Sequence, residues 1–470
     1  MIRKSQPGKN TRLSAVPQGR PGRAAYLAEV RQLARLSLPL ILAQVAQMAM
    51  GFVDTVMAGR VSPTDLAAVA IGGSIWFPIF LFAAGFLMAI TPIVAHHFGG
   101  GDYGAIPTAL RQGLWIALAL GLSGWLLLRN MEWLLAWLEL EPEVRRLAAG
   151  YLRAIAWGFP AMSIFQGLRS FSEGIGLTRP IMLIGFLGLA CNIPANYVLI
   201  YGKLGFPALG GVGCGWASAL VMWVMMLALA ALIRYGGGYR LLPPLPAWER
   251  PDPRRLGRMI RLGFPIGIAM FIETSMFAII ALLVASQGAV VVAGHQVALN
   301  FTSLIFMVPL SFAMAITIRV GQAIGRQDRQ AARFSAACGT LTTMLIAVFF
   351  AAVILLFAPA IAALYTPDPA VRRVAVGLLF FAALFQISDA VQVSAAGALR
   401  GYKDTRVPMV ITFIAFWFIG LPTGYLLGLA AWPGLYLGAT GFWIGLVAGL
   451  TTAALLQSLR LWRVSARRQA

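Results

Sequence analysis

Long apolar runs separated by short polar segments recur along the whole chain. A run of about 20 apolar residues is long enough to cross a bilayer as a helix. Twelve such runs are present, at residues 36–59, 67–95, 109–128, 148–170, 181–201, 211–234, 259–285, 292–318, 335–357, 374–398, 407–429 and 435–460. This pattern predicts an all-α membrane protein with twelve transmembrane helices.

Composition and charge support the same class. Of the 470 residues, 59% are hydrophobic and only 11% are charged, and the mean hydropathy is +0.80. Soluble domains carry more than twice that charged share. The net charge of +21 does not indicate nucleic acid, because the basic residues lie in the tails and at the ends of the runs. We therefore expect a lipid bilayer as the surroundings and no nucleic-acid partner.

The basic residues also predict an orientation. Most of the 37 Lys and Arg residues fall in segments on the same side of the membrane as the N-terminus. Cytosolic loops carry this excess in membrane proteins, so both termini are expected in the cytosol. The first apolar run is too long for a signal-peptide core, and we expect it to remain as a true span.

The two halves of the chain are copies of one another. The tetrapeptide MAIT at residues 88–91 recurs 226 residues later at 314–317, and Pro39 and Gly99 correspond to Pro265 and Gly325 at the same offset. Each copy has an even number of spans, so the copies are parallel repeats about an axis along the membrane normal. We expect a cavity between two six-helix bundles. The predicted parts are a tail at 1–35, a bundle at 36–234, a basic Pro-rich linker at 235–258, a bundle at 259–460 and a tail at 461–470.

Three of the sixteen acidic residues, Asp54, Glu273 and Asp389, fall inside the apolar runs with no Lys or Arg beside them. Each charged carboxylate at the bilayer centre costs about 2.5 to 3.5 kcal/mol. An exchangeable proton, metal cation or positively charged ligand would offset that cost. The alternative for each acid is a permanently protonated carboxyl that donates a hydrogen bond.

Amide side chains spaced three or four residues apart lie on one face of a helix. Two such sets share a face with an acid, and a third set forms a polar face without an acid. Hydrogen bonding between helices explains such amides as well as ligand binding does. The histidines at 96, 97 and 295 lie at the ends of runs, where we expect them to be solvated or to cap helices. The amides are Gln44 and Gln47 near Asp54, Gln386 and Gln392 around Asp389, and Gln296 with Asn300 on the eighth run.

Several longer motifs carry a resemblance. They are GFVDTVMAG at 51–59, GGVGCG at 210–215, GHQVALN at 294–300, DAVQ at 389–392 and LRGYKD at 399–404. Together they resemble the NorM-like branch of the multidrug and toxic compound extrusion (MATE) family over residues 30 to 465. The resemblance implies a monomeric antiporter of the bacterial inner membrane, without a cofactor. It would use Na+ or H+ as the coupling ion to export amphipathic, often cationic drugs.

The resemblance also implies roles for individual residues. Glu273 and Asp389 match the acids that bind the coupling cation, which would make them the Na+ ligands in a sodium-coupled member. Asp54 matches an acid that handles protons or substrate, and Asn192 and Asn196 match polar positions lining the N-terminal lobe.

One departure from the family pattern leaves the coupling ion open. Phe385 stands where some sodium-coupled members have tyrosine, so an oxygen near the cation is missing. The residues expected to line the substrate cavity are Gln44, Gln47, Asn192, Asn196, Gln296, Asn300, Phe385, Gln386 and Gln392.

Three other classes compete with this prediction. A lipid-linked oligosaccharide flippase of the same superfamily would favour a cationic cavity for pyrophosphate, which the centres of the runs do not supply. An intramembrane enzyme would need a nucleophile with its base or a metal pair, and the runs carry no His–Glu motif and no serine with a partner histidine. A channel would favour equivalent residues from several subunits. We therefore predict a transporter and no enzyme activity.

Overall fold

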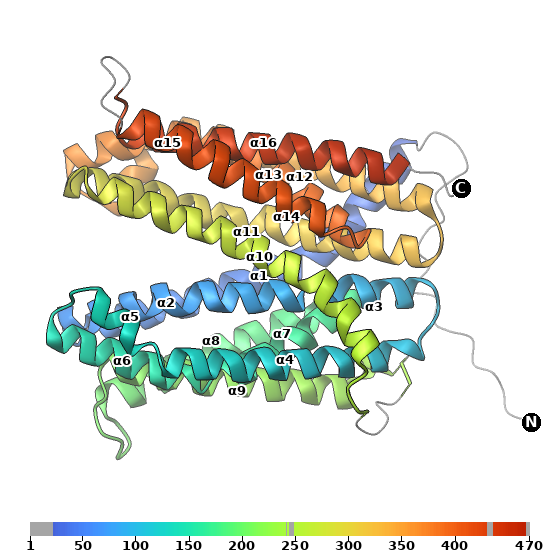
Figure 1. Ribbon diagram of the computed structural model, residues 1–470, viewed down its shortest axis with the longest axis horizontal. Coiled ribbons are helices and arrows are strands. Elements are labelled where there is room, and N and C mark those ends of the chain that lie inside the picture. Colours follow the sequence, from blue (N-terminus) through green and yellow to red (C-terminus); the bar gives the residue numbers. More distant parts are fainter. Residues whose placement is uncertain (1–21, 241, 244–248, 430–435, 467–470) are drawn as a thin grey trace, which may run out of the picture.

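The computed structural model describes residues 22–240, 242–243, 249–429 and 436–466 (Figure 1). Residues 1–21 and 467–470 of the predicted tails, residues 241 and 244–248 of the predicted linker, and residue 435 of the last predicted run lie outside this part. The helices are α1 (Arg23–Gly59), α2 (Pro63–Leu87), α3 (Ile90–Gly99), α4 (Ala105–Arg129), α5 (Glu132–Trp137), α6 (Pro142–Ala156), α7 (Phe159–Gly174), α8 (Arg179–Tyr201), α9 (Gly211–Tyr235), α10 (Pro253–Ala285), α11 (Ala289–Gly325), α12 (Arg329–Tyr365), α13 (Pro369–Gly401), α14 (Arg406–Phe413), α15 (Leu421–Gly428) and α16 (Ala439–Ala466). A 3₁₀ turn, η1 (Gly237–Tyr239), follows α9, and a π-helical segment, η2 (Ile414–Gly420), joins α14 to α15.

The twelve-helix prediction is confirmed, although some spans are not single helices. The predicted run at 67–95 is divided into α2 and α3, and the run at 407–429 contains η2. Eleven helical segments in the described part are long and apolar enough to cross a membrane. The predicted run at 148–170 consists of α6 and α7, which are separated at Trp157 and Gly158. Pro160 lies in the first turn of α7, where its missing N–H costs nothing. The chain therefore breaks and restarts within one span.

Most helices extend beyond the apolar runs. α1 begins at Arg23 rather than at residue 36, and α7 continues to Gly174 rather than ending at 170. A hydropathy window detects only apolar residues, so it does not detect polar turns that continue a helix past the bilayer. Three starts carry a clear local signal, because a capping side chain precedes a proline in the first turn. These caps are Ser62 of α2, Asp252 of α10 and Asp368 of α13.

The helices form two bundles, one made of α1–α9 and one of α10–α16 (Figure 1). Each bundle has its own apolar core. The large buried rings of the first are Phe165 and Phe171, and those of the second are Phe416, Phe442 and Trp443. The prediction of two bundles is thus confirmed by the packing.

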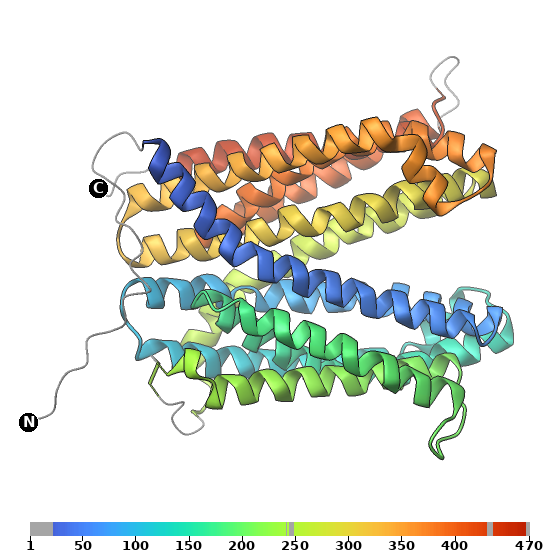
Figure 2. The same cartoon turned by 180° about the vertical axis from the view of Figure 1, so that it is seen from behind.

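The first helix of each repeat crosses from one bundle to the other. Figure 2 shows α1 starting beside the C-terminal bundle and running into the N-terminal one. It packs on α8 and also on α11, while α10 packs on α2 and also on α14. We call the end of the molecule at which α1 begins and α16 ends the terminal end. Both crossings are at this end, so the two bundles are interlocked there.

Paired contacts at the terminal end obey the repeat. Gly99 of α3 packs against the backbone carbonyl of Gln322 of α11, and Gly325 of α11 packs against that of His96 of α3. His96 Nε2 lies 2.8 Å from the carbonyl oxygen of Gly401, and Gln322 Nε2 donates to that of Gly174 at 3.2 Å. Each contact is the repeat-related copy of the other. The pseudo-two-fold axis therefore passes between α3 and α11.

Replacing Gly99 with valine should prevent the terminal end from closing. The new Cβ would overlap the Gln322 backbone, and overpacking costs about 1–3 kcal/mol, which shifts a closed-to-open ratio roughly tenfold. We expect a cysteine introduced at Gln322 to react correspondingly faster with a water-soluble maleimide. Gly257→Val is the control, because a Cβ there meets nothing within 4 Å. Equal labelling rates in both variants would contradict the expectation.

Candidate functional site

Asp54, on α1, lies at the centre of a polar cluster inside the N-terminal bundle. Asn192 and Asn196 of α8 donate to its Oδ1 at 2.9 and 2.6 Å, and Ser218 of α9 donates to its Oδ2 at 3.1 Å. The thiol of Cys214, one turn before Ser218, also interacts electrostatically with the carboxylate. The four-residue spacing of the two asparagines places them on one face of α8. The structure thus brings together three residues that were predicted separately.

This cluster has unused hydrogen-bonding capacity. Asn192 and Asn196 are fully buried, and their amide oxygens have no partner in the described part of the chain. A buried polar atom left unpaired costs about 1–3 kcal/mol. Asp54 itself is only partly buried. The cluster therefore presents a carboxylate and two free oxygen acceptors to any proton donor or cation that reaches it.

Glu273 of α10 and Asp389 of α13 form a second site, in the C-terminal bundle. Asp389 is 2% exposed and Glu273 is partly buried, and the two carboxylates interact electrostatically. No hydrogen bond or salt bridge joins either of them to another described residue. Two like charges that repel each other in a partly or fully buried site favour uptake of a positive species.

A basic side chain lies within electrostatic reach of Glu273. Arg400, at the end of α13, is buried and interacts electrostatically with both Glu273 and Glu173. No Lys or Arg lies beside the three acids within the apolar runs, so this interaction with Glu273 arises only from the packing of the helices. The apolar run ends at 398, but the helix continues and its last turn is enclosed where the two bundles meet. Arg400 also contacts the sulfur of Met88 across that boundary.

Outside the apolar runs, three further carboxylates are buried in the described helices: Glu29, Asp65 and Glu173. Asp65 of α2 accepts hydrogen bonds from the backbone N–H of Gly211 and from the hydroxyl of Ser62. Glu29 of α1 pairs with Arg319 of α11, and Glu173 pairs with Arg169 one turn earlier on α7. Both acids are less than 7% exposed. The extended helix ends carry these residues into protein packing, where a fixed arginine compensates each. Such paired acids need no exchangeable cation, which separates them from Glu273 and Asp389.

The remaining predicted residues are spread over both bundles. Phe385, Gln386 and Gln392 are buried in the C-terminal bundle, and both amide atoms of Gln386 lack a partner within the described residues. The ring of Phe385 lies 6.0 Å from those of Phe277 and Trp443. Gln296 and Asn300 are exposed on α11, and Gln44 and Gln47 are partly exposed on α1. The described structure does not gather them into one pocket.

One histidine was misjudged. His295 is 1% exposed, and its Nδ1 accepts a hydrogen bond from the indole of Trp443 at 3.1 Å. The expectation of a solvated or capping residue was wrong because α11 begins at Ala289, which places His295 in its second turn, against Trp443 of α16. In the sequence, the apolar neighbours of His295 are the signal that could have indicated its burial. Ser218 and Cys214 carried none, because small polar residues are common in membrane helices.

Comparison with known proteins identifies the family of this chain. The family model described as MatE matches the chain twice, over residues 39–198 and 265–426, so its two matches start at the same offset as the MAIT repeat. The chain belongs to the MatE family. It falls in the NorM-like branch, as the motifs predicted. This MatE protein is therefore a multi-span membrane protein built from two repeats.

Relatives cover nearly the whole length of the MatE protein. It is 49% identical to multidrug resistance protein PmpM of Pseudomonas aeruginosa over 94% of this chain and 92% of that one. It is 46% identical to multidrug resistance protein NorM of Vibrio cholerae over 93% and 96%.

Solved structures agree with the fold. The eukaryotic MATE transporter AtDTX14 superposes with a TM-score of 0.82 at 18% identity, covering 93% of this chain and 96% of that one. A MOP superfamily transporter from Pyrococcus furiosus superposes with a TM-score of 0.85 at 22% identity, covering 94% and 97%.

Proposed function

We propose that this MatE protein is a multidrug efflux antiporter that exports amphipathic, often cationic compounds and takes up Na+ or H+ in exchange. The names of its bacterial relatives support the substrate class. In this proposal the protein lies in the inner membrane with its terminal end facing the cytosol, as the distribution of Lys and Arg supports.

The observation that carries the proposal is the contrast between two kinds of buried acid. Glu29 and Glu173 each have an arginine within 3 Å, whereas Glu273 and Asp389 have no hydrogen bond or salt bridge among the described residues. No group of three or more His, Cys, Asp or Glu in the described part is arranged for a transition metal. A carboxylate pair suits the hard ligand preference of an exchangeable Na+, or a proton.

The mechanism follows from the chemistry of the two sites. A cation that binds Glu273 and Asp389 cancels their charge and weakens the attraction between Glu273 and Arg400. Arg400 sits where the bundles touch, beside Met88 and within electrostatic reach of Glu173. Cation binding therefore changes the balance of forces between the bundles, and a cationic drug competes for the same negative charge. Rocking of the two repeats then exposes the site alternately.

The change in the balance of forces between the bundles can also affect Asp54, through α1. One end of this helix carries Asp54, and the other carries Glu29, which is tied to Arg319 of the C-terminal bundle. A proton or drug bound at Asp54 acts on a helix that is anchored in both bundles. Apolar parts of a drug would contact the Met and Phe side chains of these helices, whose adaptable packing suits varied shapes.

The deciding experiment is efflux from proteoliposomes loaded with an ethidium-type dye. We expect dye efflux when either a Na+ gradient or a proton gradient alone is imposed, and none without a gradient. The gradient that works identifies the coupling ion. Dye movement that ignores both gradients would contradict antiport, and a flippase, enzyme or channel should not move the dye in this way.

A further inference from the structure

A cavity of about 590 Å³ opens at the terminal end, away from the carboxylate sites. Its walls come from α3 and α4 of the N-terminal bundle, from the first turns of α10, and from the turn between α13 and α14. Figure 1 shows the start of α10 beside α4. The size lies in the range of small-molecule sites. Both bundles contribute to it, so a bound molecule would contact both.

The walls carry a large excess of positive charge. The single lining acid, Asp404, is held by Arg460 at 2.7 Å. Of the lining arginines, Arg255 pairs with Asp252 at 3.2 Å. The cationic residues of the wall are Arg255, Arg258, Arg261, Lys403 and Arg406. Four of these have no ion-pair partner in the described part of the chain, so their charge faces the cavity unbalanced.

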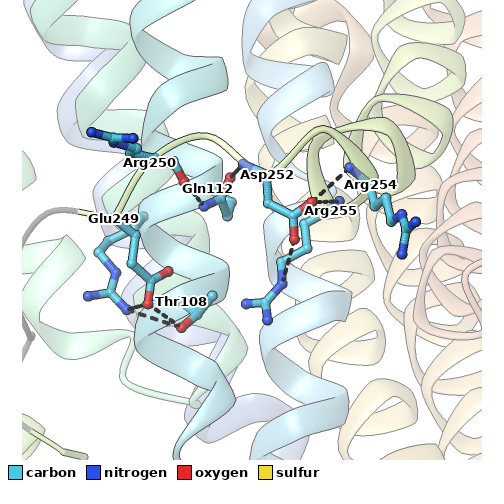
Figure 3. A network of polar contacts seen from close by, with 8 residues as sticks. Thr108, Gln112, Glu249, Arg250, Asp252, Arg254 and Arg255 are labelled. Atoms are coloured by element: carbon cyan, nitrogen blue, oxygen red, sulfur yellow. Dashed lines mark hydrogen bonds and ion pairs between the residues drawn. The ribbon is translucent and has the colours of Figure 1, made fainter.

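Neighbouring acids are already engaged elsewhere. Figure 3 shows Glu249 and Asp252 in the linker, held against Thr108 and Gln112 of α4. Glu249 also binds Arg111 at 2.5 Å. These contacts fix the linker to the N-terminal bundle, and its carboxylates are paired with Arg111 and Arg255. The linker acids therefore do not neutralise the four unpaired cationic residues of the cavity wall.

Lys403 occupies a backbone conformation that disfavours its side chain. Its φ is 61°, in the left-handed region that glycine adopts freely. The repeat-related residue of the N-terminal half is Gly176, with φ 82°. The second repeat thus carries a lysine where the first has glycine, and only the lysine lines the cavity. A strained residue of this kind points to a role for its side chain.

The titration of Lys403 agrees with an unbalanced site. Partial desolvation at the cavity wall and the nearby Arg258 lower the pKa of its ammonium to about 8. An ion-paired lysine would shift in the opposite direction. An anion bound between Lys403 and Arg258 would relieve this repulsion.

We propose that this cavity binds a phosphate-bearing anion through Arg258, Arg261, Lys403 and Arg406, and that the bound anion holds the two bundles together at the terminal end. A guanidinium group can donate two parallel hydrogen bonds to phosphate oxygens, and a lysine adds a compact positive charge. The phosphate can belong to an anionic phospholipid headgroup or to a free phosphate in the water. The site lies at helix ends rather than among the membrane acids, and its occupancy does not depend on the proposed transport.

Binding can be measured on the purified full-length protein in neutral detergent, by the shift of its thermal unfolding midpoint. The probes are dioctanoyl phosphatidylglycerol, inorganic pyrophosphate and, as an uncharged reference, dioctanoylglycerol, all at matched ionic strength. We expect a concentration-dependent rise with at least one phosphate probe. A rise with the lipid alone assigns the headgroup, and a rise with pyrophosphate assigns a soluble anion.

The double variant Arg258→Gln, Lys403→Gly should bind the active probe at least about tenfold more weakly. Glycine at 403 copies residue 176 and relieves the backbone, so the variant should still fold. Arg254→Gln is the matched control, because Arg254 is exposed, does not line the cavity and points away from Arg255 (Figure 3). Failure of both phosphate probes, or an equal loss in Arg254→Gln, would overturn the proposal.

Discussion

Replacing Asp389 or Glu273 with alanine is expected to reduce gradient-driven dye efflux to the passive leak while the protein still inserts into the membrane. Each carboxylate supplies half of the negative charge that the coupling ion neutralises, and neither has a hydrogen bond or salt bridge of its own among the described residues. Without one of them, cation binding no longer alters the forces between the bundles. Efflux from inverted vesicles, normalised to the amount of inserted protein, measures the effect.

The sign of the stability change separates a coupling role from a structural one. Removing one partner of a buried ion pair destabilises a protein, whereas removing an unpaired buried acid relieves a desolvation cost. We therefore expect Asp389→Ala, which removes an acid that no described basic residue attracts, to unfold at the same temperature as the parent or higher. Glu141→Ala is the control for loss of an acid, because Glu141 is exposed and its side chain makes no capping hydrogen bond. Unimpaired efflux by both site variants would end this model.

Replacing Arg319 with methionine should give the largest loss of stability. Its guanidinium donates two hydrogen bonds to Glu29, at 2.9 and 2.5 Å, and Ser335 donates a third to the same carboxylate at 2.7 Å. All three residues are buried. The variant would leave Glu29 buried with its charge uncompensated, which costs about 3–5 kcal/mol. Denaturant unfolding of the purified protein, followed by tryptophan fluorescence, measures the change.

The double variant Glu29→Met, Arg319→Met should recover most of this loss, because it removes both charges at once. The exposed pair Glu143 and Arg146 provides the contrast, since Arg146→Met should leave the unfolding midpoint where it is. A double variant as unstable as Arg319→Met alone would show that packing, rather than charge pairing, explains the loss.

The two kinds of membrane acid were not distinguishable in the sequence. Asp54, Glu273 and Asp389 stood out because they lie inside the apolar runs. Glu29 and Glu173 lie just outside the apolar runs, where a carboxylate ordinarily meets water. Their burial depends on Arg319, which is far from Glu29 along the chain, and on the packing of α7 among its neighbours. A local pattern carries no information about such partners.

The polar cluster around Asp54 is a second case in which the sequence does not reveal which side chains are in contact. The family resemblance marked Asn192 and Asn196, and their spacing placed them on one helical face. Their hydrogen bonds to Asp54, and the contribution of Ser218, depend on how α1, α8 and α9 pack. Likewise, the glycine at 176 and the lysine at 403 can be aligned from the repeat, but the cationic cavity exists only where the turn after α13 meets α4 and α10.

The sequence by itself determined the class of protein, the number of spans and the two-fold repeat. Hydropathy is a property of a contiguous window, and a repeat is visible as soon as one offset recurs. Only the tertiary structure decided which buried acids are neutralised by a fixed arginine and which are left for an exchangeable cation. That distinction depends on contacts between helices far apart in the chain, and the energy of a buried charge is set by the atoms around it rather than by its neighbours in sequence.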